Sequence, residues 1–219
     1  MERTGDILKH PGFKNAIRNL KMADWMDEKD DDPKSPANIM RRLNLPSLDK
    51  TFDKFKKRAG TGAVLSAFET WAEGEGKPFL LCYGSYGNGK THLLQAAILR
   101  LYERGIICRY HTFEDLLQRI KRGMQPDATY DADEITRKIC RQDYLAIDDF
   151  GLGSETKWAE GRLDVIVDYR YRYHLPTVLV TNKDLSELPP RIVSRFYDPE
   201  ISVMVVNEGG DYRRRRPGK

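Results

Sequence analysis

A lysine and a hydroxyl side chain stand next to each other at the end of a glycine-rich octapeptide. The octapeptide reads Gly84, Ser85, Tyr86, Gly87, Asn88, Gly89, Lys90 and Thr91. In a loop of this type the glycines let successive backbone N–H groups point at one phosphate, and the lysine reaches the β- and γ-phosphates. The hydroxyl of Thr91 is then placed to bind Mg²⁺. The motif therefore predicts a nucleoside triphosphate site with Mg²⁺.

The residues on both sides of the octapeptide supply the local structure that such a loop requires. Residues 79–83 form an apolar run typical of a buried strand, and residues 92–99 have the pattern of a helix. The start of that helix would direct its positive end at the bound phosphate. The alternative is a glycine-rich turn that only joins a strand to a helix, and the Lys-Thr pair at this spacing argues against it.

Two adjacent carboxylates, Asp148 and Asp149, follow a second apolar run at residues 144–147. In a protein with a phosphate loop, a strand that ends in carboxylates predicts the residues that bind the metal ion and position the attacking water. We expect Asp148 to hold Mg²⁺ beside Thr91, and Asp149 to orient or deprotonate the attacking water. The alternative is a buried strand that ends in Asp-Asp before an ordinary turn.

Strand-like and helix-like runs alternate through the rest of the chain. The strand-like runs are residues 106–111, 177–180 and 203–206, and the helical ones are residues 113–120 and 163–173. This alternation predicts an α/β fold with a parallel sheet, helices on both faces, and ligands at the carboxyl ends of the strands. Asn182 follows one of these strands, so it is a candidate sensor of the γ-phosphate or the attacking water. A turn or cap asparagine is the alternative.

The composition is typical of an intracellular protein. No apolar run approaches the roughly 20 residues that a membrane helix needs, and the N-terminus has no signal-peptide core. The cysteines Cys82, Cys108 and Cys140 are too far apart for a paired metal motif and suit buried thiols in a reducing compartment. We therefore expect a cytoplasmic protein without membrane contact. Residues 211–219 hold five basic residues and one acidic residue, which accounts for the net charge of +4.

Together these motifs resemble the AAA+ ATPases of the DnaC/DnaI helicase-loader and IstB transposition-helper group, over about residues 45 to 213. The matching segments are Thr-Phe-Asp-Lys-Phe at 51–55, Gly-Lys-Thr-His at 89–92, Ile-Asp-Asp-Phe-Gly at 147–151, Val-Thr-Asn at 180–182 and Arg-Ile-Val-Ser-Arg at 191–195. The resemblance implies a P-loop NTPase of the AAA+/ASCE type whose five parallel strands lie in the order 5-1-4-3-2. It also implies ATP and Mg²⁺ as ligands, with His92 among the nucleotide-binding residues.

The resemblance further implies roles for several polar residues. Asn182 matches the sensor of the triphosphate, and Arg195 matches the arginine finger that reaches the nucleotide of a neighbouring subunit, so self-association through Arg195 is expected. Arg191 is a candidate second interface cation and Arg213 a weak second sensor; solvated helix charge is the alternative for Arg191 and Arg195. Asp149, shorter than the glutamate usual in AAA+ proteins, predicts slow hydrolysis.

The chain divides into four predicted parts. These are a short N-terminal partner-docking segment with an acidic tether (1–34), a linker (35–60), the AAA+ ATPase domain (61–210) and a basic C-terminal tail (211–219). Phe13, Ile17 and Leu20 form a narrow apolar helical stripe that suits docking to a partner, although it could instead fold back on the ATPase domain or stay disordered. Ser35 and Pro36 predict the start of a short helix that runs to Leu43.

Three functional classes remain after the sequence is read. The first is a DnaC-like loader that assembles on a replicative DNA helicase and single-stranded DNA. The second is an IstB-like transposition helper on duplex DNA, and the third, disfavoured by the sensor-like Asn182, is a small-molecule phosphotransferase. Candidate contacts to the nucleic-acid backbone are the arginines 213–216, for which a solvated tail is the alternative, and loops that include Lys121-Arg122 and Arg137-Lys138 and would face the central channel of a subunit spiral.

Overall fold

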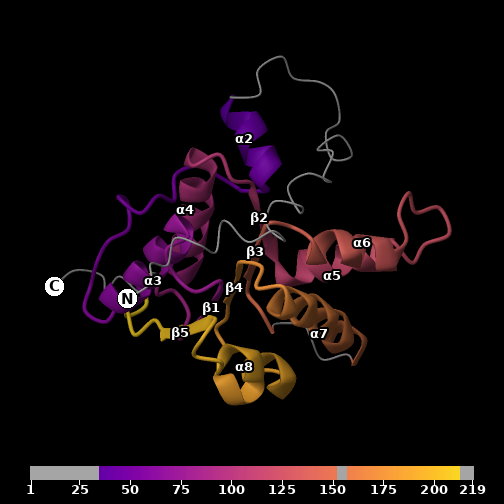
Figure 1. Cartoon of the computed structure of the whole chain (residues 1–219). Coiled ribbons are helices and arrows are strands. Elements are labelled where there is room, and N and C mark those ends of the chain that lie inside the picture. The colour runs from indigo at the N-terminus through magenta and orange to yellow at the C-terminus, as the bar shows by residue number, and fades with distance from the viewer. Residues whose placement is uncertain (1–34, 152–156, 213–219) are drawn as a thin grey trace.

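Five parallel strands form the centre of the molecule in the computed structural model, which describes residues 35–151 and 157–212 (Figure 1). The strands are β1 (Phe79–Tyr83), β2 (Cys108–Thr112), β3 (Tyr144–Asp148), β4 (Thr177–Val180) and β5 (Ser202–Val206). They lie in the order β2-β3-β4-β1-β5. Read from the other edge, this is the predicted order 5-1-4-3-2, which is confirmed.

The strand register places the carboxyl ends of the three central strands together. Thr177 at the start of β4 pairs with Phe79 on one side and with Leu145 on the other. Because the strands are parallel and in step, the segments that follow β1, β3 and β4 leave the sheet at the same edge. These segments are the phosphate loop, the Asp148-Asp149 pair and Asn182.

Two layers of helices cover the sheet because successive strand side chains point to opposite faces. Leu80 and Cys82 pack with α3 (Gly62–Glu73) and α4 (Lys90–Glu103), whereas Phe79 and Leu81 belong to the core on the other face. That second core is completed by α5 (Phe113–Arg122), α6 (Ala132–Cys140), α7 (Lys157–Arg172) and α8 (Pro190–Phe196) (Figure 1).

A short helix, α2 (Pro36–Leu43), precedes the sheet and begins as predicted. The Ser35 side chain accepts a hydrogen bond from the Asn38 N–H, and Pro36 occupies the first helical position, where its missing N–H costs nothing. The helix ends at Asn44, whose left-handed backbone (φ 56°) closes the last turn. The 1–34 segment with its stripe, and the tail from residue 213, lie outside the described residues, so the four-part division of the chain remains a prediction.

Some boundaries differ from the sequence expectation. The strand expected at residues 106–111 begins only at Cys108, since the two preceding isoleucines lie in the connection between α4 and β2. The helix expected at 163–173 begins earlier, at Lys157, and the sequence analysis did not predict α3 or α6. Both missed helices have local signals in the sequence, since Asp131 caps the start of α6 and the left-handed Gly74 ends α3.

A buried arginine holds the amino ends of two strands. Arg170 is fully buried and donates hydrogen bonds to the carbonyl oxygens of Cys140 (3.0 Å), Gln142 (2.6 Å) and Pro176 (2.7 Å). Its Nε also donates to the Thr177 hydroxyl at 2.7 Å. The guanidinium thereby ties the turns that lead into β3 and β4 to α7 and fixes where both strands begin.

All three cysteines are buried and free, as predicted. Within residues 35–151 and 157–212, no helix combines the length and the apolar character that a membrane crossing requires.

Candidate nucleotide site

The phosphate loop lies between β1 and α4, in the strand-loop-helix arrangement that the motif predicts. Three of its glycines, Gly84, Gly87 and Gly89, have positive φ values of 137°, 73° and 97°. A Cβ on Gly84 would lie 2.6 Å from the Asn207 carbonyl oxygen, and one on Gly87 would lie 1.9 Å from Asp211 Oδ1. The curl of the loop therefore depends on these glycines.

Lys90 folds back over the loop. Its buried ammonium donates to the carbonyl oxygens of Gly84 (2.8 Å) and Ser85 (2.7 Å) and to Asn88 Oδ1 (3.1 Å). Burial lowers the pKa of Lys90, while the nearby carboxylates of Asp148 and Asp149 oppose that shift. Because the Lys90 ammonium is buried and its hydrogen-bond acceptors are all neutral oxygens, its charge is not neutralised within the loop. The charged oxygens of a bound phosphate would neutralise it.

Asp148 is almost completely buried at the end of β3, where three donors hold its carboxylate. The Tyr110 hydroxyl donates to Oδ2 at 2.9 Å, the Asp149 N–H donates to Oδ1 at 2.9 Å, and the Thr91 side chain makes a further hydrogen bond. Burial raises the pKa of Asp148, and these hydrogen bonds lower it.

The donor set formed by Thr91 and Asp148 fits Mg²⁺. Mg²⁺ is usually bound through one or two protein oxygens and completes its shell with substrate phosphates and water. Among the described residues, no group of three or more His, Cys, Asp or Glu side chains could hold a metal ion on its own. The remaining ligands of a Mg²⁺ ion beside Thr91 and Asp148 would be phosphate oxygens and water.

Asn182 and Asp149 meet across the gap between two neighbouring strands. Asp149 directly follows β3 with a left-handed backbone (φ 50°), and Asn182 follows β4. The Asn182 side-chain amide donates to Asp149 Oδ1 at 2.9 Å. The structure thus brings together Lys90, Thr91, Asp148, Asp149 and Asn182, all of which line one pocket of about 640 Å³.

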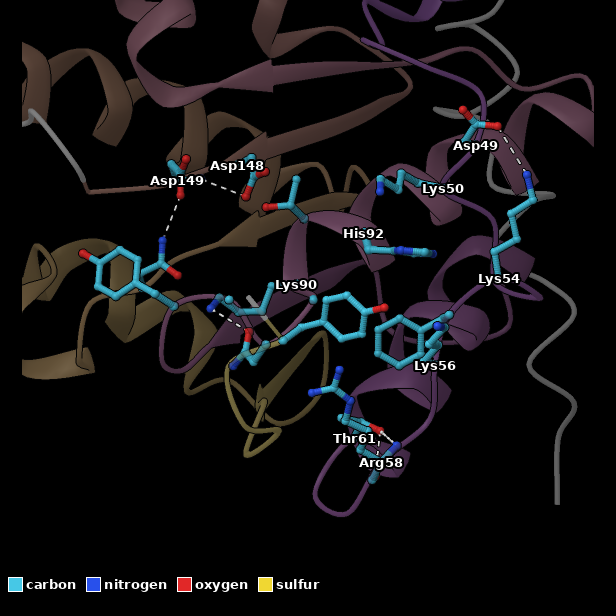
Figure 2. A pocket seen from close by; sticks show the side chains of 18 residues that line it. Asp49, Lys50, Lys54, Lys56, Arg58, Thr61, Lys90, His92, Asp148 and Asp149 are labelled. Atoms are coloured by element: carbon cyan, nitrogen blue, oxygen red, sulfur yellow. Dashed lines mark hydrogen bonds and ion pairs between the residues drawn. The ribbon is translucent and has the colours of Figure 1, made fainter. Parts of the chain in front are cut away.

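The opposite wall of this pocket comes from the linker. Figure 2 shows Asp148 and Asp149 on one side, Lys90 near the middle, and Lys54 and Lys56 on the far side. The residues that the linker and the C-terminal segment add to the pocket wall are Asp49, Lys50, Lys54, Phe55, Lys56, Arg58, Thr61 and Tyr212. The sequence analysis assigned none of them to the site, although the dense mixture of basic and aromatic residues at 50–58 was an available signal.

The aromatic part of this wall is held by specific contacts. His92 Nε2 donates a hydrogen bond to the Thr51 carbonyl oxygen (2.8 Å), and the His92 ring meets the Phe55 ring edge to face, with centroids 5.4 Å apart. Burial lowers the pKa of His92. On the other side, the Arg58 guanidinium lies 4.3 Å from the centroid of the Tyr212 ring.

The segment after β5 returns across the phosphate loop. Asn88 Nδ2 donates to the Asn207 carbonyl oxygen (2.8 Å), and Asn207 Nδ2 donates back to the Asn88 carbonyl oxygen (3.2 Å). The Tyr212 N–H then donates to the Gly87 carbonyl oxygen at 2.7 Å. Residues far apart in the sequence therefore fix the loop from outside.

Arg195 lies in α8 and does not line the pocket of its own chain. Its side chain is 12% exposed and donates to Asp164 (3.2 Å) and Asp168 (2.5 Å) of α7. The Arg195 hydrogen bond lowers the pKa of Asp168. Arg191 also pairs with Asp164, at 3.2 Å, and is 79% exposed. The roles assigned to both arginines concern a second subunit and stay predictions.

The two basic pairs considered for DNA contact lie in the last turns of α5 and α6 rather than in the loops that the sequence analysis expects. Lys121, Arg122 and Arg137 are exposed. Lys138 is half-buried, pairs with Glu134 at 3.5 Å, and lies 3.2 Å from the centroid of the Tyr130 ring. Part of this charge is therefore already engaged within the chain.

A family model described as the bacterial DnaA ATPase domain matches residues 48–197. The matched range contains the phosphate loop, the Asp148-Asp149 strand, Asn182 and Arg195. The chain belongs to this AAA+ family. The predicted relationship to AAA+ ATPases is thereby confirmed. The match also shows a relationship to the ATPase domain of DnaA, which the sequence analysis did not name.

Known relatives of this AAA+ chain include loaders and initiators. The replicative helicase loader DnaC of Escherichia coli K12 is 28% identical over 139 residues, which is 62% of this chain and 56% of DnaC. The chromosomal replication initiator DnaA of Limosilactobacillus fermentum is 28% identical over 176 residues, which is 75% of this chain and 38% of DnaA. The chain thus spans about half or less of these relatives.

A solved structure shows the same fold with a nucleotide analogue. The AMPPCP-bound DnaA of Aquifex aeolicus is 25% identical and superimposes with a TM-score of 0.62, covering 73% of this chain and 50% of that one. These similarities support the DnaC part of the predicted resemblance and extend it to DnaA. They give no specific support to the IstB part.

Proposed function

We propose that this protein binds ATP with Mg²⁺ and hydrolyses it slowly. The main observation in support is that one pocket is lined by Lys90, Thr91, Asp148, Asp149 and Asn182. The AMPPCP complex of a DnaA with the same fold supports ATP as the nucleotide.

The side chains divide the work between binding and turnover. Lys90, released from the carbonyl oxygens of Gly84 and Ser85, pairs with the β- and γ-phosphates, and the loop N–H groups hold their oxygens. When bound, Mg²⁺ neutralises charge that develops on the phosphates. Asp149 accepts the proton of the attacking water, and its hydrogen bond from Asn182 fixes the orientation of that carboxylate. The short Asp149 side chain keeps turnover low.

The aromatic wall provides the base end of the site. Phe55 and His92 offer apolar ring surface, and the Tyr212 ring lies at the same end beside Arg58. A purine can stack on such surfaces. ATP would then span the pocket from this wall to Lys90.

Two substitutions test binding and turnover separately. Lys90→Ala should abolish ATP binding in calorimetry, because it removes the buried cation. Asp149→Asn should bind ATP with near-normal affinity and lose hydrolysis, since its amide cannot take a proton. Wild-type affinity in the Lys90→Ala protein would refute the proposed site.

We infer that the biological role is replicative helicase loading. The similarity to DnaC loaders supports this role. The expected partners are a replicative helicase and single-stranded DNA, held through backbone contacts, with self-association through Arg195. A DnaA-like initiator role is the second candidate, because the matched family is the DnaA ATPase domain and the DnaA match covers more of this chain.

A pull-down with the full chain distinguishes the two roles. Retention of a helicase ring by the wild type supports a loader. Loss of that retention in the Phe13→Ser, Leu20→Ser double variant, at an unchanged melting temperature, supports docking through the N-terminal segment. Absence of helicase together with sequence-specific binding to duplex DNA supports an initiator. Binding to single-stranded DNA that weakens steeply with salt and has little sequence preference supports the proposed backbone contacts.

A further inference from the structure

The metal-side carboxylate depends on a tyrosine that belongs to none of the motifs. Tyr110 lies in β2, the edge strand next to β3, and its hydroxyl donates to Asp148 Oδ2 at 2.9 Å. Asp148 is 1% exposed, so little water is available to replace this donor. A hydrogen bond to a buried carboxylate is among the stronger kinds.

The direction of this hydrogen bond follows from the charge on Asp148. An ionised carboxylate can only accept hydrogen bonds, so the Tyr110 hydroxyl is the donor. Gln95, one turn after Thr91 on α4, is a second polar neighbour of that hydroxyl.

The backbone of Tyr110 is fixed as well. It pairs with Ala146 in the β2–β3 ladder, two residues before Asp148 and therefore on the same face of the sheet. The Tyr110 carbonyl oxygen accepts a hydrogen bond from the Asn44 side chain at 2.8 Å. The hydroxyl is thus presented to Asp148 from a strand held on both sides.

We propose that Tyr110 is a positioning residue that orients Asp148 for Mg²⁺. The inference rests on the proposed ATP and Mg²⁺ site. With its Oδ2 held by Tyr110 and its Oδ1 by the Asp149 N–H, the Asp148 carboxylate stays in one orientation beside the Thr91 hydroxyl. Without the tyrosine hydroxyl the buried carboxylate loses one fixed donor and turns more freely, which weakens the metal site and leaves the phosphate loop intact.

The test measures ATP binding by calorimetry in EDTA and at increasing MgCl₂ concentrations. In Tyr110→Phe, the ATP affinity in EDTA should match that of the wild type. The MgCl₂ concentration that gives half of the maximal increase in ATP affinity (the MgCl₂ midpoint) should rise about tenfold. Gln95→Leu, which removes a polar neighbour of the Tyr110 hydroxyl, should raise this MgCl₂ concentration about threefold. Both shifts are expected without any effect on the metal-free affinity.

Tyr171→Phe is the matched control. The Tyr171 hydroxyl donates to Asp198 at 2.7 Å, between α7 and the turn after α8, so this change also removes a tyrosine–carboxylate hydrogen bond. Its MgCl₂ midpoint should equal that of the wild type. An unchanged midpoint in Tyr110→Phe, or an equal shift in Tyr171→Phe, overturns the proposal. A wild-type protein that binds no ATP in either condition refutes the underlying site instead.

Discussion

Asn182 donates a hydrogen bond to Asp149 Oδ1 at 2.9 Å and thereby joins the ends of two neighbouring strands, β4 and β3. Asp149 needs this support because its backbone is left-handed and its side chain is short. The pair places an amide and a carboxylate at the edge of the sheet where the phosphate loop also ends. Several expected outcomes depend on this arrangement and on the contacts around it.

Removal of the Asn182 amide should impair turnover more than binding. In Asn182→Ala the Asp149 carboxylate loses its orienting donor, so the hydrolysis rate should fall by about 10² while ATP affinity changes less than about threefold. Steady-state hydrolysis and calorimetry measure the two effects. A variant that loses affinity and rate equally would indicate that Asn182 contributes to binding instead.

Hydrolysis should require a neighbouring subunit if Arg195 is the finger. Specific activity should then rise with protein concentration, and Arg195→Ala alone should lose most of it. Mixing Arg195→Ala with Asp149→Asn protein should restore part of the activity, because one subunit supplies the arginine and the other an intact site. A self-contained site predicts activity that is flat with concentration and no rescue on mixing.

Arg170 should be more important for stability than its exposed neighbour Arg172. Arg170→Leu leaves the carbonyl oxygens of Cys140, Gln142 and Pro176 buried without their donor, so the free energy of unfolding should fall by about 3 kcal/mol or more. Arg172→Leu removes a surface ion pair with Asp168 and should cost less than about 1 kcal/mol. Urea unfolding of the two variants gives the comparison, and equal losses would contradict it.

Acid should destabilise the fold partly through His111. Burial, together with Arg119 and Arg109, lowers the pKa of His111 from 6.5 to about 3, although Asp115 opposes the shift. Between these values the unfolded chain binds a proton that the folded chain does not. Stability contributed by the neutral ring is therefore complete above pH 6.5 and is lost as the pH falls towards 3, by up to about 1.4 kcal/mol per pH unit.

Replacement of His111 should remove this part of the pH dependence. The free energy of unfolding of His111→Gln, measured in urea from pH 7.5 to 4.5, should fall less steeply than that of the wild type. Parallel curves for the wild type and His111→Gln would show that His111 does not titrate on unfolding.

The sequence alone was sufficient to predict that the phosphate loop, the carboxylate strand and Asn182 lie together at one edge of the sheet. Each of these is defined by residue types at short, fixed spacing, and their order along alternating strands and helices predicted a parallel sheet with its ligands at one edge. The strand order followed from the family resemblance. The start of α2 at Ser35 was equally local, because a cap depends only on its own first turn.

The tertiary structure alone decided which distant residues complete the site. Tyr110 reaches Asp148 over a separation of 38 residues because β2 and β3 are neighbours in the sheet. Tyr212 reaches Gly87 because the chain turns back after β5. Arg195 pairs with α7 rather than with its own pocket. Such contacts depend on how elements pack in space, and no short sequence spacing specifies that packing.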